Sequence, residues 1–141
     1  MVQLEDEVAP IMHPERDQSS RAVHILVVDD EEDIRDVLRA FLEARGYDVM
    51  VAENGPTALK CAEHFPGSID LLITDLRMPN MDGIELARQM RTHRSEIRVL
   101  HMSAHVDELA TSGKLKPNAN IIAKPFLPAN LSEKVSHILA R

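Results

Sequence analysis

The sequence is poor in cysteine, aromatic rings and long apolar runs, and each shortage excludes a class of protein. Its 141 residues include one cysteine, Cys61, no tryptophan, one tyrosine and three phenylalanines. A single thiol cannot form an internal disulfide, so we expect a reducing, cytoplasmic setting. No stretch approaches the roughly 18 consecutive apolar residues of a membrane span. The first ten residues carry three acids instead of the basic start of a signal peptide.

Basic charge is also scarce. The chain has 16 lysines and arginines against 23 acids, for a net charge of −7. A nucleic-acid surface needs basic patches and aromatic rings for stacking, so we expect no direct nucleic-acid binding and no membrane contact. The partners that remain are proteins and small ligands. With 44% hydrophobic residues, the chain has enough apolar side chains for one ordinary core.

Residues 1–21 have no sustained apolar period, so we predict a flexible tail there and a single domain over 22–141. In the domain, short apolar runs alternate with amphipathic segments. Strands are expected at 24–28, 48–52, 70–74, 98–103 and 120–123, and helices at 55–65, 81–94 and 104–113 and near both ends of the domain. The first helix has one apolar stripe and ends at Gly46; the stripe consists of Ile34, Val37, Leu38, Phe41 and Leu42, and the last helix repeats the pattern from Leu131 to Leu139. This alternation predicts an α/β fold with a parallel sheet.

In a parallel sheet with helices on both faces, ligands bind beyond the carboxyl ends of the strands. The predicted strands place reactive side chains at those ends, namely Asp29 and Asp30, then Asp75, Ser103 and Lys124. Carboxylates held close together repel unless a cation lies among them. Oxygen ligands without clustered histidine or cysteine favour a hard ion, and Mg²⁺ suits a few carboxylates beside a phosphate.

Asp75 directly follows a buried strand, in the run "LLITDLRMPNMDG" from Leu71 to Gly83. A carboxylate in that position can act as a covalent acceptor of a phosphoryl group. Mg²⁺ and Lys124 would neutralise the anion from two sides, and the Ser103 hydroxyl would donate a hydrogen bond to it. The exposed position of Asp75 thus predicts that it is phosphorylated.

With these motifs in place, the sequence resembles the receiver domains of two-component response regulators over residues 23–141. The resemblance rests on "VVDDE", "LLITDLRMPNMDG", "MSA" and "AKPF", in this order and each at a strand end. It implies a doubly wound, flavodoxin-like (βα)₅ fold with strand order 2-1-3-4-5. It also implies that a histidine kinase or a histidine phosphotransfer protein phosphorylates Asp75.

The resemblance assigns further roles. Asp30 and Asp75 would bind Mg²⁺ directly, Asp29 through water, and the Arg77 backbone carbonyl would complete the set. Lys124 would be the counter-ion of the phosphoryl group, and the Lys124–Pro125 peptide bond would be cis. The sequence departs from the family at two positions, because Ile121 occupies the usual aromatic switch position and Ser103 replaces the commoner threonine. The readout of phosphorylation is therefore expected to differ.

Three questions about function stay open at this point. The chain ends after its last predicted helix, so it is either a stand-alone regulator with an unknown protein partner or the receiver of a hybrid sensor kinase. A metal-dependent phosphatase with an aspartyl-phosphate intermediate would need a second acid where Arg77 stands. An interaction module that ignores phosphorylation is the third possibility. We expect no enzymatic activity other than self-catalysed phosphorylation and slow self-catalysed dephosphorylation. The dephosphorylation is expected to be slow because, by the receiver pattern, the bulky side chains of Arg77 and His105 would flank the phosphoryl group.

Overall fold

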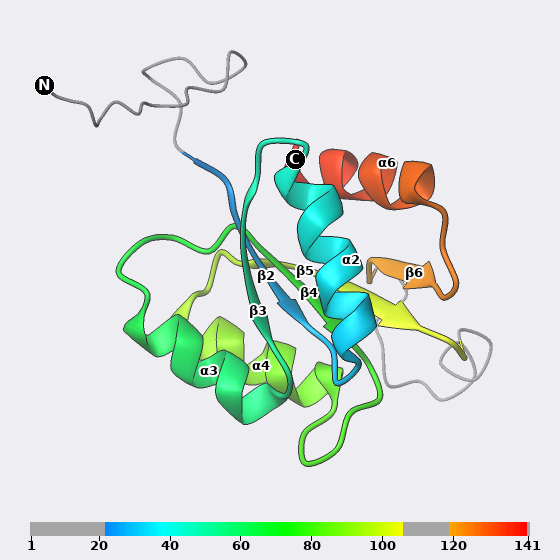
Figure 1. The fold of residues 1–141 in the computed structure, drawn as a ribbon. Helices are drawn as coiled ribbons and strands as arrows, with labels where there is room; N and C mark the ends of the chain where they lie inside the picture. Colours follow the sequence, from blue (N-terminus) through cyan, green and yellow to red (C-terminus); the bar gives the residue numbers. More distant parts are fainter. Residues whose placement is uncertain (1–21, 106–118, 141) are drawn as a thin grey trace, which may run out of the picture.

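Within residues 22–105 and 119–140, the part of the chain that this computed structural model describes, five parallel strands form one sheet (Figure 1). Counted from the amino end of the chain, their order is 2-1-3-4-5, as predicted. In the order of the sheet they are β3 (Asp48–Ala52), β2 (His24–Val28), β4 (Leu71–Asp75), β5 (Arg98–Ser103) and β6 (Ile121–Ala123). β4 and β6 each begin one residue later than the sequence predicted.

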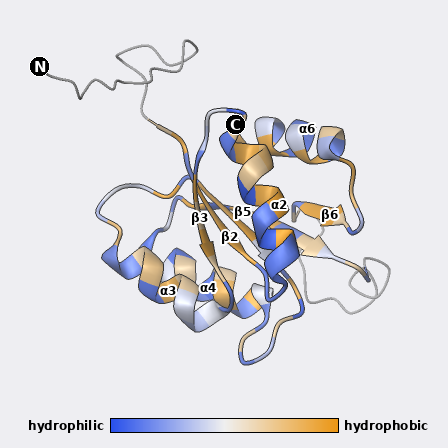
Figure 2. Cartoon of the chain, viewed as in Figure 1, coloured by the Kyte–Doolittle hydropathy of each residue, from blue (hydrophilic) through white to orange (hydrophobic). Residues whose placement is uncertain are grey.

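The central strands are apolar on both faces because helices cover both. All four residues from Ile25 to Val28 are fully buried, and they alternate between two separate cores. α2 (Glu32–Glu43) and α6 (Pro128–Leu139) cover one face, whereas α3 (Gly55–His64) and α4 (Gly83–His93) cover the other (Figure 1). Figure 2 shows the strands as mostly hydrophobic and the helices as mixed, as expected for a buried sheet between amphipathic layers.

Each helix contributes a few side chains to its core. On the first face, Leu38 and Leu42 of α2 pack with Leu131 and Val135 of α6 against the sheet. On the second face, alanines of α3 lie with residues of α4 that include two large ones; the buried set is Ala58, Ala62, Leu86, Ala87 and Met90. The two cores hold the sheet in the middle of the domain and leave only its edges to solvent.

The stripe expected on the first helix is narrower than predicted. Leu38 and Leu42 are buried and Ile34 and Phe41 pack against the core, but Val37 is 61% exposed. A helix packed on a sheet buries mainly the residues that face the sheet, and Val37 lies at the outer margin of the stripe. The expected tail over 1–21 and most of the helix expected at 104–113 lie outside the described residues. In the described part of the chain, no helix is long and apolar enough to cross a membrane.

Candidate functional site

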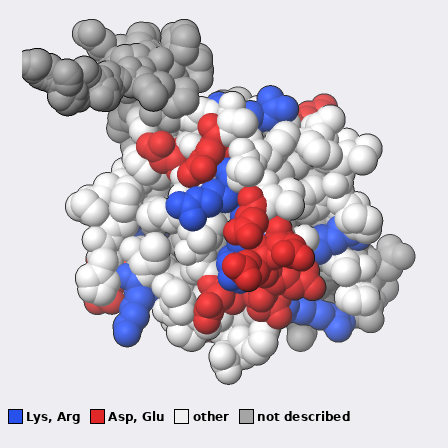
Figure 3. Space-filling view, viewed as in Figure 1, with Lys and Arg blue, Asp and Glu red and all other residues white. Residues whose placement is uncertain are grey.

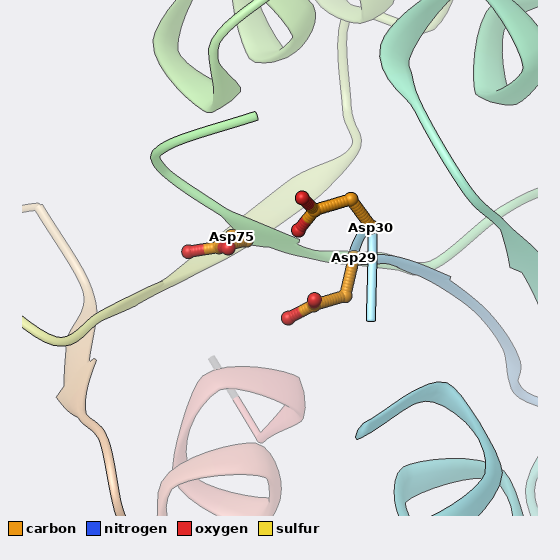
Figure 4. Close-up of side chains that lie close together, drawn as sticks. All are labelled: Asp29, Asp30 and Asp75. Carbon is orange, nitrogen blue, oxygen red and sulfur yellow. The ribbon is translucent and has the colours of Figure 1, made fainter. Parts of the chain in front are cut away.

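Three carboxylates gather at the carboxyl edge of the sheet. Asp29 and Asp30 follow the last residue of β2, and Asp75 ends the neighbouring strand β4. β2 and β4 pair in parallel with Val28 opposite Thr74, so the residues that follow each strand reach the carboxyl edge of the sheet next to one another. One oxygen from each carboxylate lies within 4.8 Å of the other two, and Figure 4 shows the three side chains together. The sequence prediction that these acids converge is confirmed.

Asp29 is fully buried and bonded on all sides. One carboxylate oxygen accepts the Glu31 backbone N–H at 2.9 Å, and the other accepts Lys124 Nζ at 2.8 Å. Its backbone N–H donates to the Ala52 carbonyl at 3.2 Å, and its own carbonyl accepts Arg35 Nη1 at 2.8 Å. Because both carboxylate oxygens already have partners, Asp29 is a fixed part of the site.

Asp30 differs from its neighbour in burial and in hydrogen bonding. It is exposed, and in the described part of the chain its carboxylate has no hydrogen-bond donor or ion-pair partner. Its oxygens nevertheless lie within reach of Asp75 (Figure 4). An exposed carboxylate with unused lone pairs can bind a cation and leave space for the water molecules that a hard ion retains.

Asp75 and Lys124 form the electrostatic centre of the site. Lys124 Nζ lies 3.4 Å from Asp75 Oδ2, so the ammonium is shared between Asp75 and Asp29. The prediction that Asp75 is exposed is wrong: it ends a fully buried strand and is itself only 9% exposed, because the neighbouring strands and the residues after them enclose it. Burial raises the pKa of Asp75; the nearby Lys124 lowers it in part, and the negative charge of Asp29 raises it further. Burial alone would lower the pKa of Lys124, but its contacts with the two carboxylates outweigh burial and raise it. Lys124 is therefore a cation at neutral pH.

Ser103 ends β5, beside Asp75 in the next strand. It is buried, and its Oγ accepts the backbone N–H of His105 at 2.9 Å, which leaves the hydroxyl hydrogen for another acceptor. The Lys124 backbone N–H donates to the Ser103 carbonyl at 2.8 Å, so the hydroxyl and the ammonium come from adjoining strands. The Lys124–Pro125 peptide is cis, as predicted.

The remaining predicted positions lie around this centre. Arg77 is exposed, and its backbone N–H faces the Asp75 carboxylate. Ile121 is half-buried in β6, where it pairs with His101 of β5 and takes no part in the acidic group. His105 is exposed just beyond Ser103. The structure thus brings together Asp29, Asp30, Asp75 and Lys124, with Ser103 adjoining them.

Two residues that support the site were not predicted. Arg35 of α2 donates to the Asp29 carbonyl, a contact six residues along the chain that no strand-end pattern indicates. Gly83 begins α4 directly against the Asp75 carbonyl oxygen, where a Cβ atom would collide with it. The sequence predicted only that a helix lies over 81–94; in the structure Asp82 caps α4 by accepting the Glu85 N–H at 2.8 Å. The close approach of Gly83 to Asp75 is visible only in the fold.

The fold and the acidic edge define a doubly wound α/β domain with a cluster of carboxylates at the carboxyl ends of its strands. A model of the response regulator receiver domain matches residues 25–136, and the chain belongs to this family of two-component signalling domains. Such domains interact with histidine kinases or phosphotransfer proteins.

Two of the curated relatives that the chain resembles are named as transcriptional regulators. The alkaline phosphatase synthesis transcriptional regulatory protein PhoP of Bacillus subtilis is 39% identical over 118 residues, which are 83% of this chain and 48% of that protein. The probable transcriptional regulator ycf27 of Cyanidium caldarium is 37% identical over 131 residues, or 92% of this chain and 51% of the relative. The chain therefore spans about half the length of the curated relatives it matches.

Solved structures agree with the fold. The receiver domain of the hybrid histidine kinase CckA is 34% identical, with a TM-score of 0.71 over 82% of this chain and 98% of that one. A response regulator receiver domain protein from Clostridium thermocellum has a TM-score of 0.73 at 26% identity, over 84% of this chain and 95% of that one.

Proposed function

We propose that this domain is a phosphorylation-dependent switch. Asp75 accepts a phosphoryl group from a histidine kinase or a histidine phosphotransfer protein, with Mg²⁺, and the signal passes on by partner binding or phosphorelay. One observation carries the proposal: Lys124 Nζ lies 2.8 Å from Asp29 and 3.4 Å from Asp75, beside a third carboxylate that is exposed. This arrangement provides an acceptor, a fixed cation and an open acidic position at one point.

The transfer makes one bond and breaks one. An oxygen of the Asp75 carboxylate attacks the phosphorus of a phosphohistidine, and the P–N bond breaks as the new O–P bond forms. The departing imidazole nitrogen keeps the electron pair of the broken bond and takes up a proton. Asp75 must be ionised to attack, and the neighbouring Lys124 favours that form against burial and the charge of Asp29.

The donor set fits Mg²⁺, because it consists of carboxylate oxygens with no histidine or cysteine among them. Asp30 and Asp75 are the proposed direct ligands, together with the Arg77 backbone carbonyl. Asp29 would act through water, since both of its oxygens already accept hydrogen bonds. When bound, Mg²⁺ would offset the charge of the carboxylates and of the incoming phosphoryl oxygens.

The other residues of the site act on the phosphoryl group itself. Lys124 would pair with it, and the Ser103 hydroxyl hydrogen, which is not needed for the contact with His105, would be donated to one of its oxygens. Ile121 cannot supply the polar group of an aromatic tyrosine, so we propose that the movement of Ser103 is read through apolar packing on β6. The compartment we propose is the cytoplasm, where the free thiol of Cys61 would stay reduced.

Phosphorylation with acetyl phosphate or a phosphorylated histidine phosphotransfer domain, followed by intact-mass spectrometry, tests the proposal. Wild type should gain the mass of one phosphate with Mg²⁺ and none with EDTA. Asp75→Asn should gain none, whereas Asp36→Asn, which alters an exposed acid on α2, should label like wild type. Equal labelling of Asp75→Asn would end the assignment.

A further inference from the structure

Arg35 reaches from α2 back to the end of β2. It is half-buried, and its Nη1 donates to the Asp29 carbonyl at 2.8 Å. That carbonyl belongs to the peptide bond that joins Asp29 to Asp30. Figure 3 shows acidic side chains gathered in one area over the start of α2, where the first turn carries Glu32 and Asp33. The guanidinium of Arg35 is therefore a positive charge within an acidic area, and its hydrogen bond to the Asp29 carbonyl indicates its role.

The contact fixes the direction in which the chain leaves the sheet. The Asp29 backbone N–H donates to the Ala52 carbonyl of β3, and the Asp29 carbonyl accepts from Arg35 of α2. Both sides of this residue are thus held by different elements, one from the sheet and one from a helix. The orientation of the peptide plane after Asp29 sets where the next Cα atom lies, and so where the Asp30 side chain starts.

Asp30 depends on this restraint more than its neighbours do. Asp29 is held by its own carboxylate bonds, and Asp75 by the pairing of β4 with β5, in which it lies opposite Met102. The Asp30 carboxylate is exposed and, among the described residues, has no partner that would hold it. Its position is therefore set by its backbone. A ligand that must meet Asp75 across one cation needs this kind of support.

We propose that Arg35 is a positioning residue for the metal-dependent reaction at Asp75: it holds the Asp29–Asp30 peptide so that Asp30 stays within reach of the cation shared with Asp75. This inference rests on the proposed function. It assigns Arg35 no contact with phosphate or metal. It gives the two adjacent acids different roles: Asp29 is a buried structural residue, and Asp30 is a metal ligand whose position depends on its backbone.

A positioning role for Arg35 and a simple effect of its charge predict opposite changes in Mg²⁺ affinity. A guanidinium is always protonated, and next to a cation site its charge repels the metal. If only charge mattered, removal of Arg35 would strengthen Mg²⁺ binding. If Arg35 positions Asp30, its removal weakens binding despite the lost repulsion. The sign of the change in affinity therefore decides between the two.

The experiment titrates Mg²⁺ alone into wild type, Arg35→Met, Arg35→Lys and Arg39→Met at constant ionic strength, by calorimetry. Methionine keeps the unbranched stem without a donor, and lysine restores a charged donor of different shape. Arg39 is the control because it lies one turn further along α2, is half-exposed and, among the residues that the structure describes, pairs only with Glu43 at 3.4 Å. We expect Arg35→Met to bind about tenfold more weakly, Arg35→Lys to recover part of the loss, and Arg39→Met to bind as wild type or slightly more tightly.

Two further readouts separate positioning from general loss of stability. In the acetyl phosphate reaction, Arg35→Met should need about tenfold more Mg²⁺ for half-maximal rate, with the rate at saturating Mg²⁺ nearly that of wild type. In metal-free protein, the Glu31 amide, which donates to Asp29 Oδ1 at 2.9 Å, should exchange its hydrogen faster in this variant. Unchanged or tighter Mg²⁺ binding by folded Arg35→Met would overturn the inference, whatever its melting temperature.

The outcome is independent of the proposed function's own test. If wild type neither binds Mg²⁺ nor is labelled at Asp75, the proposed function fails and the inference with it. If wild type binds and is labelled, and folded Arg35→Met behaves identically, only the role of Arg35 is wrong. Should Arg35→Met not fold, the same titration of Arg35→Lys decides, because weakened binding supports positioning and unchanged binding refutes it.

Discussion

The two edges of the sheet both carry charged side chains, but they use them in opposite ways. At the amino edge, Arg94 donates to three backbone carbonyls, those of Gly67 and Ala62 at 2.8 Å and Phe65 at 3.0 Å. There the carboxylate of Asp70 accepts the His24 backbone N–H at 2.9 Å. At the carboxyl edge, the charges face one another instead: Lys124 pairs with Asp29 and Asp75, and the Asp30 carboxylate lies close to those two acids.

The difference shows what each edge is for. A charge that meets neutral backbone groups satisfies the chain that it joins, and the amino edge thereby closes the loops between α3, α4 and the strands. Three carboxylates with one ammonium leave a surplus of negative charge, and burial, together with the charge of Asp29, raises the pKa of Asp75 despite Lys124. The amino edge is built for stability, whereas the carboxyl edge keeps an imbalance that a cation and a phosphoryl group can use.

The largest expected effect is a loss of stability at low pH, caused by protonation of His101 in β5, the strand that also carries Ser103. His101 of β5 is buried, and among the described residues neither ring nitrogen makes a hydrogen bond of good geometry; the nearby backbone of Gly83 and Asn120 offers only weak contacts. Burial, with the charge of Arg91 adding to it, lowers the pKa of His101 to about 4; the Gly83 and Asn120 carbonyls oppose this only in part. A lowered folded pKa means that protonation favours unfolding, so stability is full above the ordinary pKa near 6.5 and falls toward pH 4.

Urea unfolding at several pH values measures this loss. Between pH 7 and pH 4 wild type should lose on the order of 3 kcal/mol more than His101→Leu. His137→Gln, which alters an exposed histidine of α6, should keep the wild-type pH dependence. An identical pH profile for His101→Leu and wild type would contradict the prediction.

The second-largest effect is expected at the amino edge, where Arg94→Met should destabilise the domain. Three carbonyls would lose a charged donor, two of them partly buried, and we expect the free energy of unfolding to fall by about 2 kcal/mol. The exposed pair of Arg88 with Glu85 is the control, and Arg88→Met should change it by no more than roughly 0.5 kcal/mol. Phosphorylation of folded Arg94→Met should proceed at the wild-type rate. A slower rate would show that the two edges are coupled, and that the comparison between them is wrong.

Within the carboxyl edge, the two acids of the pair should differ. Asp30→Ala should weaken Mg²⁺ binding by about tenfold or more, because an exposed ligand with unused lone pairs is lost. Asp29→Ala should weaken it less, since the carboxylate of Asp29 is already used by Lys124 and Glu31. Calorimetric titration of both variants decides, and a larger loss in Asp29→Ala would reverse the roles.

A smaller effect of opposite sign is expected from Asp75→Asn. The folded pKa of Asp75 is raised, so its charge opposes folding at any pH above that value. Asparagine should therefore stabilise the domain by about 1 kcal/mol at pH 7, and the gain should shrink toward pH 4 and below. Thermal unfolding with Asp36→Asn as control tests this. A destabilised Asp75→Asn would mean that the ion pair with Lys124 outweighs burial.

The smallest effect concerns the lifetime of the phosphoryl group. Arg77 is exposed beside Asp75, is bulky, and has no acceptor with which to orient an attacking water. We expect phosphorylated Arg77→Ala to lose phosphate about twofold to fivefold faster than wild type, an energy difference below about 1 kcal/mol. Loss that is unchanged or slower in Arg77→Ala would rule out shielding.

Much of the fold followed from local pattern. The alternation of apolar runs and amphipathic stretches predicted a parallel sheet, and the residues at its strand ends predicted the acidic site. The limits of the pattern are visible at Val37, which belongs to the apolar stripe by spacing and yet is 61% exposed. Periodicity records which side of a helix is apolar but not how wide a contact the sheet offers it.

The sequence by itself determined which groups reach the carboxyl edge, because parallel strands deliver their last residues to the same side. Only the tertiary structure decided how those groups divide their work. Asp29 and Asp30 are adjacent and chemically identical, but one is enclosed by Lys124 and Arg35 and the other is open to solvent. Burial and hydrogen bonding depend on which distant side chains arrive, and Lys124 comes from 95 residues away. The sequence alone does not show which distant residues come into contact. The pKa of Asp75 and the position of Asp30 are therefore properties of the folded domain.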